Sequence, residues 1–431
     1  MKVGLIGLGT VGCGTVNVLQ RNADEISRRA GRSIVVTQAA VKDINKARDC
    51  DVSTLTLLED SFSVVNDPSI DVIVELVGGE GLAKDLVLRA IENGKHVVTA
   101  NKALIALHGN EIFAAAQAKG VMVAFEAAVA GGISIIKAIR EGLAGNRIEW
   151  LAGIINGTSN YILTELDTPG QDFADVLAEA QRLGYAESDP TFDIEGIDAA
   201  HKLTILASIA FGIPLQFEKI YTEGITQISQ QDVQFAEELG YRIKHLGIAR
   251  RSEAGIELRV HPTLIPKTRL IANVNGVMNA VVIHGDAVGS TLHYGAGAGA
   301  EPTASAVVAD IIDVVRVLTA DPENRVPHLA FQPDKLSDVR ILPMDEVQTG
   351  FYLRLNLSDE SGVLASITEL LGQHGINIEA FLQKPSDEES ATAVILTKTA
   401  REGDFKIALD KIKALSSVLS EPVSFRVESL S

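Results

Sequence analysis

Short apolar runs alternate with segments of helical spacing along the first 130 residues of the chain. The apolar runs are rich in Val and Ile and are bounded by Gly, Asn or Asp, which is typical of buried strands. They lie at residues 2–7, 33–41, 72–77, 96–99 and 121–125. Residues 82–93 and 106–119, between these runs, have the spacing of helices. Strands that alternate with helices predict parallel βαβ units and therefore a Rossmann-type, doubly wound α/β domain over residues 1–130.

The middle of the chain, residues 131–318, mixes both periodicities and predicts an α+β domain. Helical patterns occupy residues 172–183 and 198–211, and apolar β-like runs occupy residues 255–263 and 279–284. A further helix is expected at about residues 302–318, and we expect it to return to the N-terminal domain.

The pattern changes again after residue 318. Four prolines (Pro322, Pro327, Pro333 and Pro343) fall in a stretch with little periodicity, which predicts a linker over residues 319–348. Residues 349–431 then follow the order βαββαβ, which predicts a ferredoxin-like unit. Its first strand is expected to place Phe351, Leu353, Leu355 and Leu357 on one face. The other strands are expected at residues 376–381, 391–396 and 423–427, with a charged hairpin at 386–390.

Composition limits the class of function. A length of 431 residues is consistent with about three domains at roughly 150 residues each. The formal charge of −18 disfavours binding to nucleic acid or to an anionic membrane. Two cysteines cannot form a disulfide framework, no apolar stretch is long enough for a membrane span, and no signal peptide is expected. We therefore expect a cytoplasmic protein that acts on small molecules.

A glycine-rich turn connects the first predicted strand to the first predicted helix. The sequence Gly7-Leu8-Gly9-Thr10-Val11-Gly12 allows a tight turn and brings the backbone close to a pyrophosphate at a helix N-terminus. This context predicts a dinucleotide site. At the end of the second strand, Asp43 is placed to bind the ribose of NAD and Lys42 to pair with the 2′-phosphate of NADP. The sequence leaves the two cofactors open.

Asp198 and Lys202 lie four residues apart on a predicted helix and therefore on one face. Such a pair is often a solvated ion pair, but residues 203–211 carry no charge, which indicates a buried helix whose first turn faces a cleft. The preceding segment, residues 184–193, is rich in carboxylates. We interpret the pair as functional, whereas His201 is expected to pack or to form a hydrogen bond.

Two other segments are candidates with open alternatives. Lys102 follows a predicted parallel strand, at the sheet edge where ligands bind, and is either a solvated strand end or a cofactor contact. The glycine-rich residues 295–299 precede a predicted helix and either hold a phosphate or form a flexible turn.

Taken in order, these segments resemble homoserine dehydrogenase over nearly the whole chain. The motifs are residues 7–12, 99–102, 125–133, 156–161, 184–187 and 193–202, with the glycine loop before Pro302-Thr303. The tail resembles an ACT domain, a module that commonly binds amino acids, and residues 359–364 match its first loop. The resemblance implies reversible, NAD(P)-dependent reduction of L-aspartate 4-semialdehyde to L-homoserine, in threonine, methionine and isoleucine biosynthesis.

The resemblance also implies roles for individual residues. Lys202 would be the proton donor, with Asp198 and Lys102 as further catalytic residues. The substrate would contact Glu187, Asp193, Asp198, Gly157 and Thr158. The cofactor would contact Gly7, Gly9, Thr10, Val11, Gly12, Lys42, Thr99, Ala100, Lys102, Gly184 and Gly299. A Na⁺ or another monovalent cation would bind at Glu126, Val129, Gly131 and Ile133, mainly through backbone carbonyls.

The same resemblance implies that residues 131–318 form the catalytic and dimerisation domain of a homodimer or homotetramer. Through the tail, an amino-acid effector such as L-threonine would control activity. Two other readings stay open: an oxidoreductase for a related amino-acid semialdehyde, and a non-catalytic amino-acid sensor that binds nucleotide.

Overall fold

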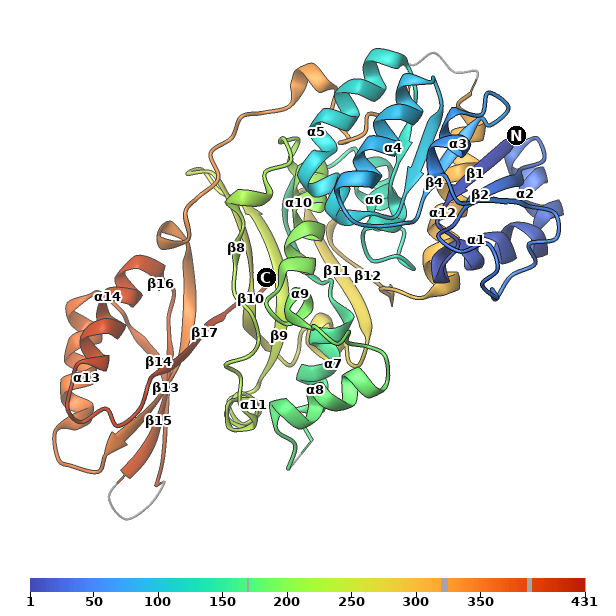
Figure 1. The fold of residues 1–431 in the computed structure, drawn as a ribbon. Coiled ribbons are helices and arrows are strands. Elements are labelled where there is room, and N and C mark those ends of the chain that lie inside the picture. Colours follow the sequence, from blue (N-terminus) through green and yellow to red (C-terminus); the bar gives the residue numbers. More distant parts are fainter. Residues whose placement is uncertain (169, 319–324, 386–389, 431) are drawn as a thin grey trace. The chain divides into compact units, whose positions relative to one another are not determined.

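In the computed structural model, six parallel strands form the sheet that the N-terminal pattern predicts (Figure 1). Their order is β3-β2-β1-β4-β5-β6, and each neighbouring pair is parallel. The strands are β1 (Lys2–Ile6), β2 (Val35–Ala40), β3 (Thr56–Leu58), β4 (Val72–Glu75), β5 (His96–Thr99) and β6 (Val123–Ala124). The strand order reverses between β1 and β4, and ligands bind beyond the carboxyl ends of the strands at such a point.

The predicted strands are all present, and one strand was missed. All four residues of β4 are buried, as expected of a parallel strand covered on both faces. The missed strand, β3, has only three residues, too few to show a periodic pattern, and it is defined by its pairing with β2.

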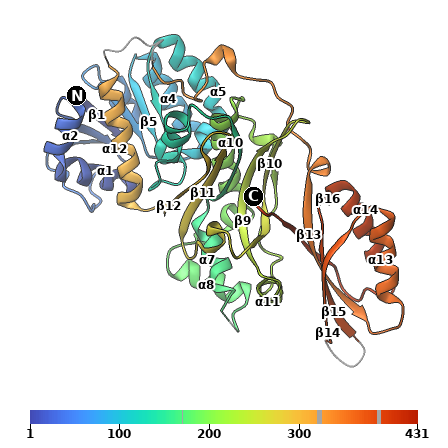
Figure 2. The same cartoon turned by 180° about the vertical axis from the view of Figure 1, so that it is seen from behind.

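Helices cover both faces of this sheet (Figure 2). The helices of the N-terminal segment are α1 (Thr10–Arg21), α2 (Ala23–Ala30), α3 (Ser61–Asn66), α4 (Gly81–Glu92) and α5 (Lys102–Lys119). The later helix α12 (Ala300–Arg316) shares one hydrophobic core with α1, α2, β1 and β2. Small residues allow its close approach, because a side chain at Gly14 would lie 2.5 Å from the carbonyl oxygen of Ala300.

The structure describes residues 1–168, 170–318, 325–385 and 390–430, and they divide into two units. The first unit comprises Met1–Leu151, His201–Glu218 and Met278–Val339, and the second comprises Ala152–Ala200, Lys219–Val277 and Arg340–Ser431. The first unit also holds the 3₁₀ turn Glu126–Ala128, the short helices α6 (Ile135–Lys137), Ala138–Gly142 and Phe217–Lys219, and an antiparallel hairpin of β11 (Met278–Gly285) and β12 (Gly289–Ala296). Strand β7 (Ile148–Ile154) and helix α10 (Ile197–Phe211) continue from one unit into the other.

The second unit is built on a mixed sheet whose order is β9-β10-β17-β13-β15-β14. These strands are β9 (Tyr241–Arg251), β10 (Ile256–Pro266), β13 (Gln348–Ser358), β14 (Ile378–Pro385), β15 (Ser390–Thr397) and β17 (Val423–Val427), with β8 (Tyr221–Thr222) on β10 and β16 (Ala400–Arg401) on β13. Its helices are α7 (Gly157–Glu165), α8 (Phe173–Arg182), α9 (Thr191–Ile194), α11 (Gln230–Glu238), α13 (Val363–Gln373) and α14 (Glu402–Lys413).

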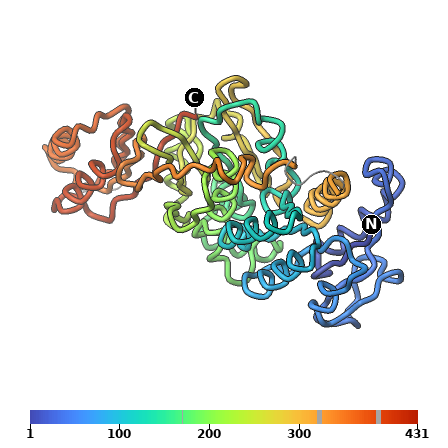
Figure 3. The backbone as a smooth tube through the Cα atoms, turned by 90° about the horizontal axis from the view of Figure 1, so that it is seen from above, coloured from blue at the N-terminus to red at the C-terminus, as the bar shows by residue number. Residues whose placement is uncertain are grey.

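The tail has the predicted βαββαβ order, but it shares its sheet with the middle of the chain. Strand β17 is antiparallel to β13 within the tail and parallel to β10 on its other side, so the C-terminal end of the trace lies beside the yellow-green strands in Figure 3. On one face, Phe351, Leu353 and Leu355 pack under α13 and α14. On the other face, Tyr352 and Phe425 belong to a core that includes α7, α8 and α11. Both faces of the tail sheet are therefore covered.

The segment predicted as a linker is packed where it is described. Leu329, Leu342 and Met344 are buried, and Ile341 forms a bridge with Ile256. Residues 319–324 of this segment, and 386–389 of the predicted charged hairpin, lie outside the described residues. Among the helices that are described, none combines the length and apolar character that crossing a bilayer requires.

Candidate active site

The glycine turn after β1 has the geometry of a dinucleotide cradle. Gly7 has φ +99° and lies against the backbone of Leu76, where a side chain would come within 2.9 Å. Gly12 is packed on the carbonyl oxygen of Gly7, at 2.5 Å from the position of a Cβ atom. Gly9 differs, since nothing lies within 4 Å of its Cβ position and no side chain caps α1 there. The N–H groups of the first turn of α1, residues 10–12, have no acceptor within the helix, and this open helix end suits a pyrophosphate.

A buried carboxylate organises the neighbouring strand ends. Glu75, fully buried at the end of β4, accepts hydrogen bonds from the amides of Val77 and Gly78, both at 2.9 Å, and from the Thr99 hydroxyl at 2.6 Å. The Thr99 hydroxyl in turn accepts the amide of Asn101 at 3.0 Å. Glu75 thus fixes two loops beside the glycine turn, a role that sequence patterning did not show.

Lys102 is the first residue of α5 and lies directly after this strand end, as predicted. Asn101 caps the helix by accepting the Leu104 amide at 3.1 Å, and its own amide donates to the Gly79 carbonyl at 2.7 Å. The connection through Ala100 is therefore held at both ends. Lys102 is half-buried at the carboxyl edge of the sheet, where a cofactor contact is expected.

The end of β2 carries exposed polar groups. Lys42 and Asp43 are both exposed, and the Asp43 carboxylate accepts the Asn45 amide at 2.8 Å in a local turn. Arg48 donates to the backbone carbonyl of Asp43, which brings a second cation to the loop of Lys42. Sequence spacing did not single out Arg48, because it lies outside the strand-end position that the fingerprint specifies.

In the second unit, Asn156 joins two of the predicted acidic residues. Its side-chain amide donates to Asp193 at 2.7 Å and to Asp198 at 2.8 Å. Its carbonyl oxygen accepts the Ser159 amide at 2.7 Å and so caps α7. Asn156 and Asp198 are buried, and the Ser159 hydroxyl donates to the Asp193 carbonyl at 3.0 Å. The structure thus brings Asp193 and Asp198 together beside a helix N-terminus.

Gly157 and Thr158 form the first turn of that helix. A side chain at Gly157 would lie 2.8 Å from the carbonyl oxygen of Val277, so this position requires glycine. The Thr158 hydroxyl donates to the Tyr185 carbonyl at 2.6 Å, which holds the loop that starts at Gly184. The first N–H groups of a helix have no partner within it. These two amides can therefore bind an anion.

Glu187 lies in the loop that follows α8. Its side chain is exposed, and its backbone carbonyl accepts the Gln181 amide at 3.0 Å. Helix α10 places Asp198 and Lys202 one turn apart, with Lys202 half-buried and the residues after it uncharged, as predicted. His201 is buried and stacks on Phe217 with ring centroids 4.4 Å apart, the packing role expected for it.

The glycine-rich loop before α12 contacts the loop predicted to bind a cation. The carbonyl of Gly297 accepts the amide of Gly131 at 2.9 Å, and a side chain at Gly131 would lie 2.6 Å from the Thr303 hydroxyl. Gly299 has φ +127° and immediately precedes the helix. At the helix start, Glu301 forms a bidentate ion pair with Arg21 of α1.

Glu126, Val129, Gly131 and Ile133 are all buried in one loop after β6. The Glu126 carboxylate accepts the amides of Ile136 and Lys137, both at 2.9 Å, and burial together with the charge of Asp310 raises its pKa to about 7. Among the described residues, no group of three or more His, Cys, Asp or Glu side chains can hold a metal. A cation in this loop would therefore depend mainly on backbone oxygens.

Three family models together match most of the chain. They are a homoserine dehydrogenase model at residues 134–312, the NAD-binding domain of homoserine dehydrogenase at residues 7–126, and an ACT domain at residues 351–417. The homoserine dehydrogenase of Pseudomonas aeruginosa is 64% identical over 100% of this chain and 99% of its own length. The chain belongs to the homoserine dehydrogenase family. It is therefore an NAD(P)-dependent oxidoreductase.

Two other homoserine dehydrogenases support the assignment over the full length. The enzyme of Neisseria gonorrhoeae is 56% identical, with 100% of this chain and 99% of the relative covered. The crystal structure of a homoserine dehydrogenase from Thiobacillus denitrificans has 64% identity and a TM-score of 0.96, covering 100% of this chain and 99% of that one. The family assignment and the three-part fold that the sequence predicted are confirmed.

Proposed function

We propose that the chain catalyses the reversible, NAD(P)-dependent reduction of L-aspartate 4-semialdehyde to L-homoserine, in threonine, methionine and isoleucine biosynthesis. One observation carries the choice of substrate: Asn156 holds Asp193 and Asp198 together at the N-terminus of α7. An amino acid presents an ammonium and a carboxylate on one carbon. A carboxylate pair beside free helix N–H groups complements both charges.

In this proposal, the substrate ammonium lies against Asp193 and Asp198, with the exposed Glu187 as an outer contact. The substrate carboxylate binds the amides of Gly157 and Thr158. The reacting carbon then lies beyond the α-carbon, which distinguishes the 4-semialdehyde from substrates without a zwitterionic end. A related amino-acid semialdehyde would share the zwitterion and differ only in the length of its side chain, so it remains the alternative that the assay must include.

Lys202 holds the proton that the reaction needs. Bound NAD(P) supplies or accepts the hydride. Lys202 donates a proton to the oxygen that becomes the homoserine hydroxyl, and removes it in the direction of oxidation. Asp198 lies one turn earlier on α10, on the same face as Lys202. Lys102, at the end of β5, contributes a second positive charge at the cofactor.

The cofactor side of the proposal uses the strand ends of the first unit. Gly7, Gly9, Thr10, Val11 and Gly12 form the pyrophosphate turn, while Thr99 and Ala100 precede Lys102. The remaining contacts are Lys42 at the 2′ position, and Gly184 and Gly299 in their glycine loops. We further propose a monovalent cation, such as Na⁺, on the loop of Glu126, Val129, Gly131 and Ile133.

We also propose that each segment of the chain has the role that the sequence indicated. Residues 1–130, with α12, bind the cofactor; residues 131–318 carry catalysis and dimerisation; residues 319–348 connect; and residues 349–431 regulate. A cytoplasmic homodimer or homotetramer is proposed, and exposed Val288, Leu292 and Tyr294 on and beside the edge strand β12 support an interface there. L-Threonine is the first effector to test on the tail.

The test is nicotinamide reduction by the full chain with L-homoserine and with homologous hydroxy amino acids, using NAD⁺ and NADP⁺ in turn. Turnover with homoserine is expected, and its absence with both cofactors would overturn the proposal. Lys202→Met should lower kcat by about 10²- to 10⁴-fold, the usual contribution of a positioned proton donor. Cofactor binding, measured by protein fluorescence or calorimetry, should be unchanged. A near-normal kcat would remove the assigned role.

A further inference from the structure

The last strand of the tail carries a buried arginine whose side chain contacts residues from the middle of the chain. Arg426 in β17 is 6% exposed. It donates to both carboxylate oxygens of Glu402 in the tail helix α14, at 3.0 Å from Nε to Oε2. Its remaining N–H groups reach across to Glu223 and, at 3.1 Å, to the Tyr221 hydroxyl. One guanidinium thus joins a tail carboxylate to a carboxylate that follows β8.

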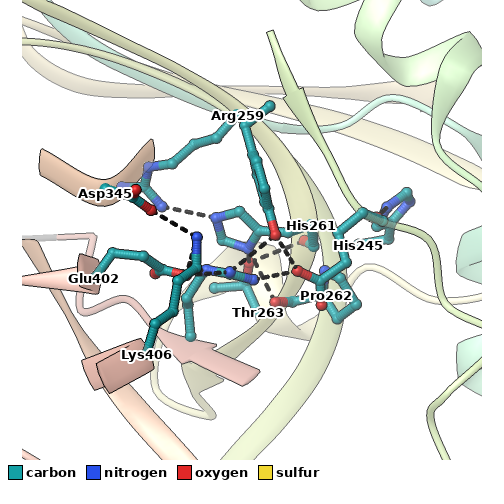
Figure 4. A network of polar contacts seen from close by, with 11 residues as sticks. His245, Arg259, His261, Pro262, Thr263, Asp345, Glu402 and Lys406 are labelled. Carbon is teal, nitrogen blue, oxygen red and sulfur yellow. Dashed lines mark hydrogen bonds and ion pairs between the residues drawn. The ribbon is translucent and has the colours of Figure 1, made fainter. Parts of the chain in front are cut away.

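Figure 4 shows the surroundings of this contact. Glu402 lies near Lys406, whose ammonium pairs with Asp345 at 2.7 Å. On the other side, Arg259 donates to the Nε2 atom of His261 at 2.9 Å, which keeps that imidazole neutral. Burial and neighbouring arginines hold the pKa of His261 well below its usual range. The junction is therefore a fixed polar network in which each charged group has a defined partner.

The carboxylate, the amide and the carbonyl of Glu223 each form a hydrogen bond. Its carboxylate accepts the Tyr221 hydroxyl at 2.7 Å as well as Arg426. Its amide donates to the Val260 carbonyl at 2.8 Å, and its carbonyl accepts Nε2–H of His245 at 2.9 Å. The position of the Glu223 backbone is consequently set by the tail on one side and by β9 and β10 on the other.

The turn after Glu223 packs against the segment that connects Asp193 and Asp198, the two carboxylates proposed to bind the substrate. The Ile225 amide donates to the Ile194 carbonyl at 2.9 Å, and a side chain at Gly224 would lie 2.6 Å from that same carbonyl. The His245 ring packs on Gly196, with Cε1 only 2.9 Å from the position of a Cβ atom. Residues 194–196 connect Asp193 of α9 to Asp198 of α10. Residues 223–225 and His245 thus pack against residues 194–196, the segment that positions the acidic pair.

We propose that Arg426 is a positioning residue for the substrate pocket: by fixing Glu223, it sets the backbone of residues 194–196 and therefore the spacing of Asp193 and Asp198. The inference rests on the proposed role of those two carboxylates. The tail is then a structural part of the amino-acid site. Because coupling is reciprocal, a ligand that shifts β17 changes the affinity for homoserine, and homoserine changes the affinity for that ligand.

A second arginine of the tail provides a matched control. Arg354 in β13 forms a bidentate ion pair with Asp232 of α11, which is fully buried and also accepts the Tyr352 hydroxyl at 2.9 Å. This pair joins the same two parts of the chain. Its hydrogen bonds run to α11 and not to residues 194–196. Loss of Arg354 should therefore weaken docking of the tail without moving the acidic pair.

The experiment compares Arg426→Met, Arg426→Lys and Arg354→Met in the full chain. Steady-state oxidation is measured with homoserine varied and then with the cofactor varied, and thermal unfolding is recorded for each protein. Arg426→Met should raise the KM for homoserine about 3- to 30-fold, the range seen for residues that couple sites. Its KM for the cofactor should stay within about twofold. Arg426→Lys, which keeps the charge, should restore part of the loss.

Arg354→Met should lower the unfolding temperature and leave the KM for homoserine within about twofold of the parent. Equal KM values in Arg426→Met and Arg354→Met, or a parallel rise in the cofactor KM, would overturn the inference. If Arg426→Met does not fold, Glu223→Gln replaces it, because it removes only the charge. Its homoserine KM should rise about two- to threefold, and an unchanged value would equally overturn the inference.

Asp193→Asn and Asp198→Asn separate this inference from the proposed function. If both leave the KM for homoserine unchanged, the acidic pocket is wrong, and the role of Arg426 falls with it. If they raise the KM while the Arg426 variants do not, the pocket stands and only the positioning role fails.

Discussion

Asn156→Asp tests the carboxylate pair directly, because the replacement keeps the shape of the side chain. In the parent chain, the Asn156 amide donates to Asp193 at 2.7 Å and to Asp198 at 2.8 Å. The aspartate variant retains an oxygen that can accept the Ser159 amide, so the cap of α7 survives. It loses the donor and places a third carboxylate against two others. The perturbation is therefore electrostatic and local.

The size of the effect follows from the two hydrogen bonds lost. A hydrogen bond to a charged group contributes about 1.5–3 kcal/mol, so the loss at neutral pH is about 3–6 kcal/mol before any relaxation. Repulsion raises the pKa of a carboxyl in the variant site above the unfolded value of about 3.9. A carboxyl with a raised folded pKa stabilises fully below its unfolded pKa, and that contribution is lost as pH rises through the folded value. The difference in free energy of unfolding between the parent and the variant should therefore grow as pH rises.

The assay is thermal or urea unfolding of parent and variant at about pH 5 and about pH 8, with homoserine kinetics in the same buffers. The gap in stability should be larger at the higher pH, and the KM for homoserine should rise at least about tenfold, since tenfold is only 1.4 kcal/mol. Asn156→Ser is the control: it keeps an N-cap acceptor and adds no charge, so its loss of stability should depend less on pH than that of Asn156→Asp. An Asn156→Asp variant with a pH-independent gap and a normal KM would refute the reasoning.

Three further outcomes follow from the first unit. Gly9→Ala should fold as the parent does yet raise the KM for cofactor, whereas Gly12→Ala should lose about 1–3 kcal/mol of stability in urea unfolding because its Cβ meets a backbone oxygen at 2.5 Å. Lys42→Ala should raise the KM for NADP⁺ more than that for NAD⁺; equal changes would remove Lys42 from the 2′-phosphate. His328 accepts the Val123 amide, and burial lowers its pKa to about 4, so its stabilising effect is lost as pH falls from about 6.5 toward that value. His328→Gln should flatten this part of the stability–pH curve.

Much of the fold follows from local periodicity. Strand β17 was predicted at the residues where it lies, and Phe351, Leu353 and Leu355 share the predicted face. The glycine turn was also recognisable, because its requirements are local: a positive φ, a close backbone approach and an open helix end. A feature whose contacts all lie close together in the sequence can therefore be predicted from its residue types.

The residues that sequence reasoning missed act over longer separations. Asn156 contacts carboxylates 37 and 42 positions away, and Glu75 binds a hydroxyl 24 positions away. A single asparagine or glutamate at a strand end has no periodic signal, because its partners are fixed by the packing of separate elements. The acidic residues near 184–193 could be found as a cluster, but the amide that joins two of them could not. Arg48 was missed for a different reason: its contact with Asp43 is local, but it lies outside the strand-end position that the fingerprint specifies.

The prediction of a tail that follows a linker implied a separable module, and the packing of the second unit argues against removing it. Arg259 of β10 has no exposed surface and binds Glu428 from the tail together with Glu257. Taking away one partner of such a buried ion pair costs about 3–5 kcal/mol. Truncation before residue 349 would also strip Tyr352 and Phe425 from the core beneath α7 and α11. Loss of activity after deletion would thus report damage to the second unit itself. Feedback control therefore has to be tested by point substitutions in the loop after β13, at residues 359–362, which leave the shared sheet intact.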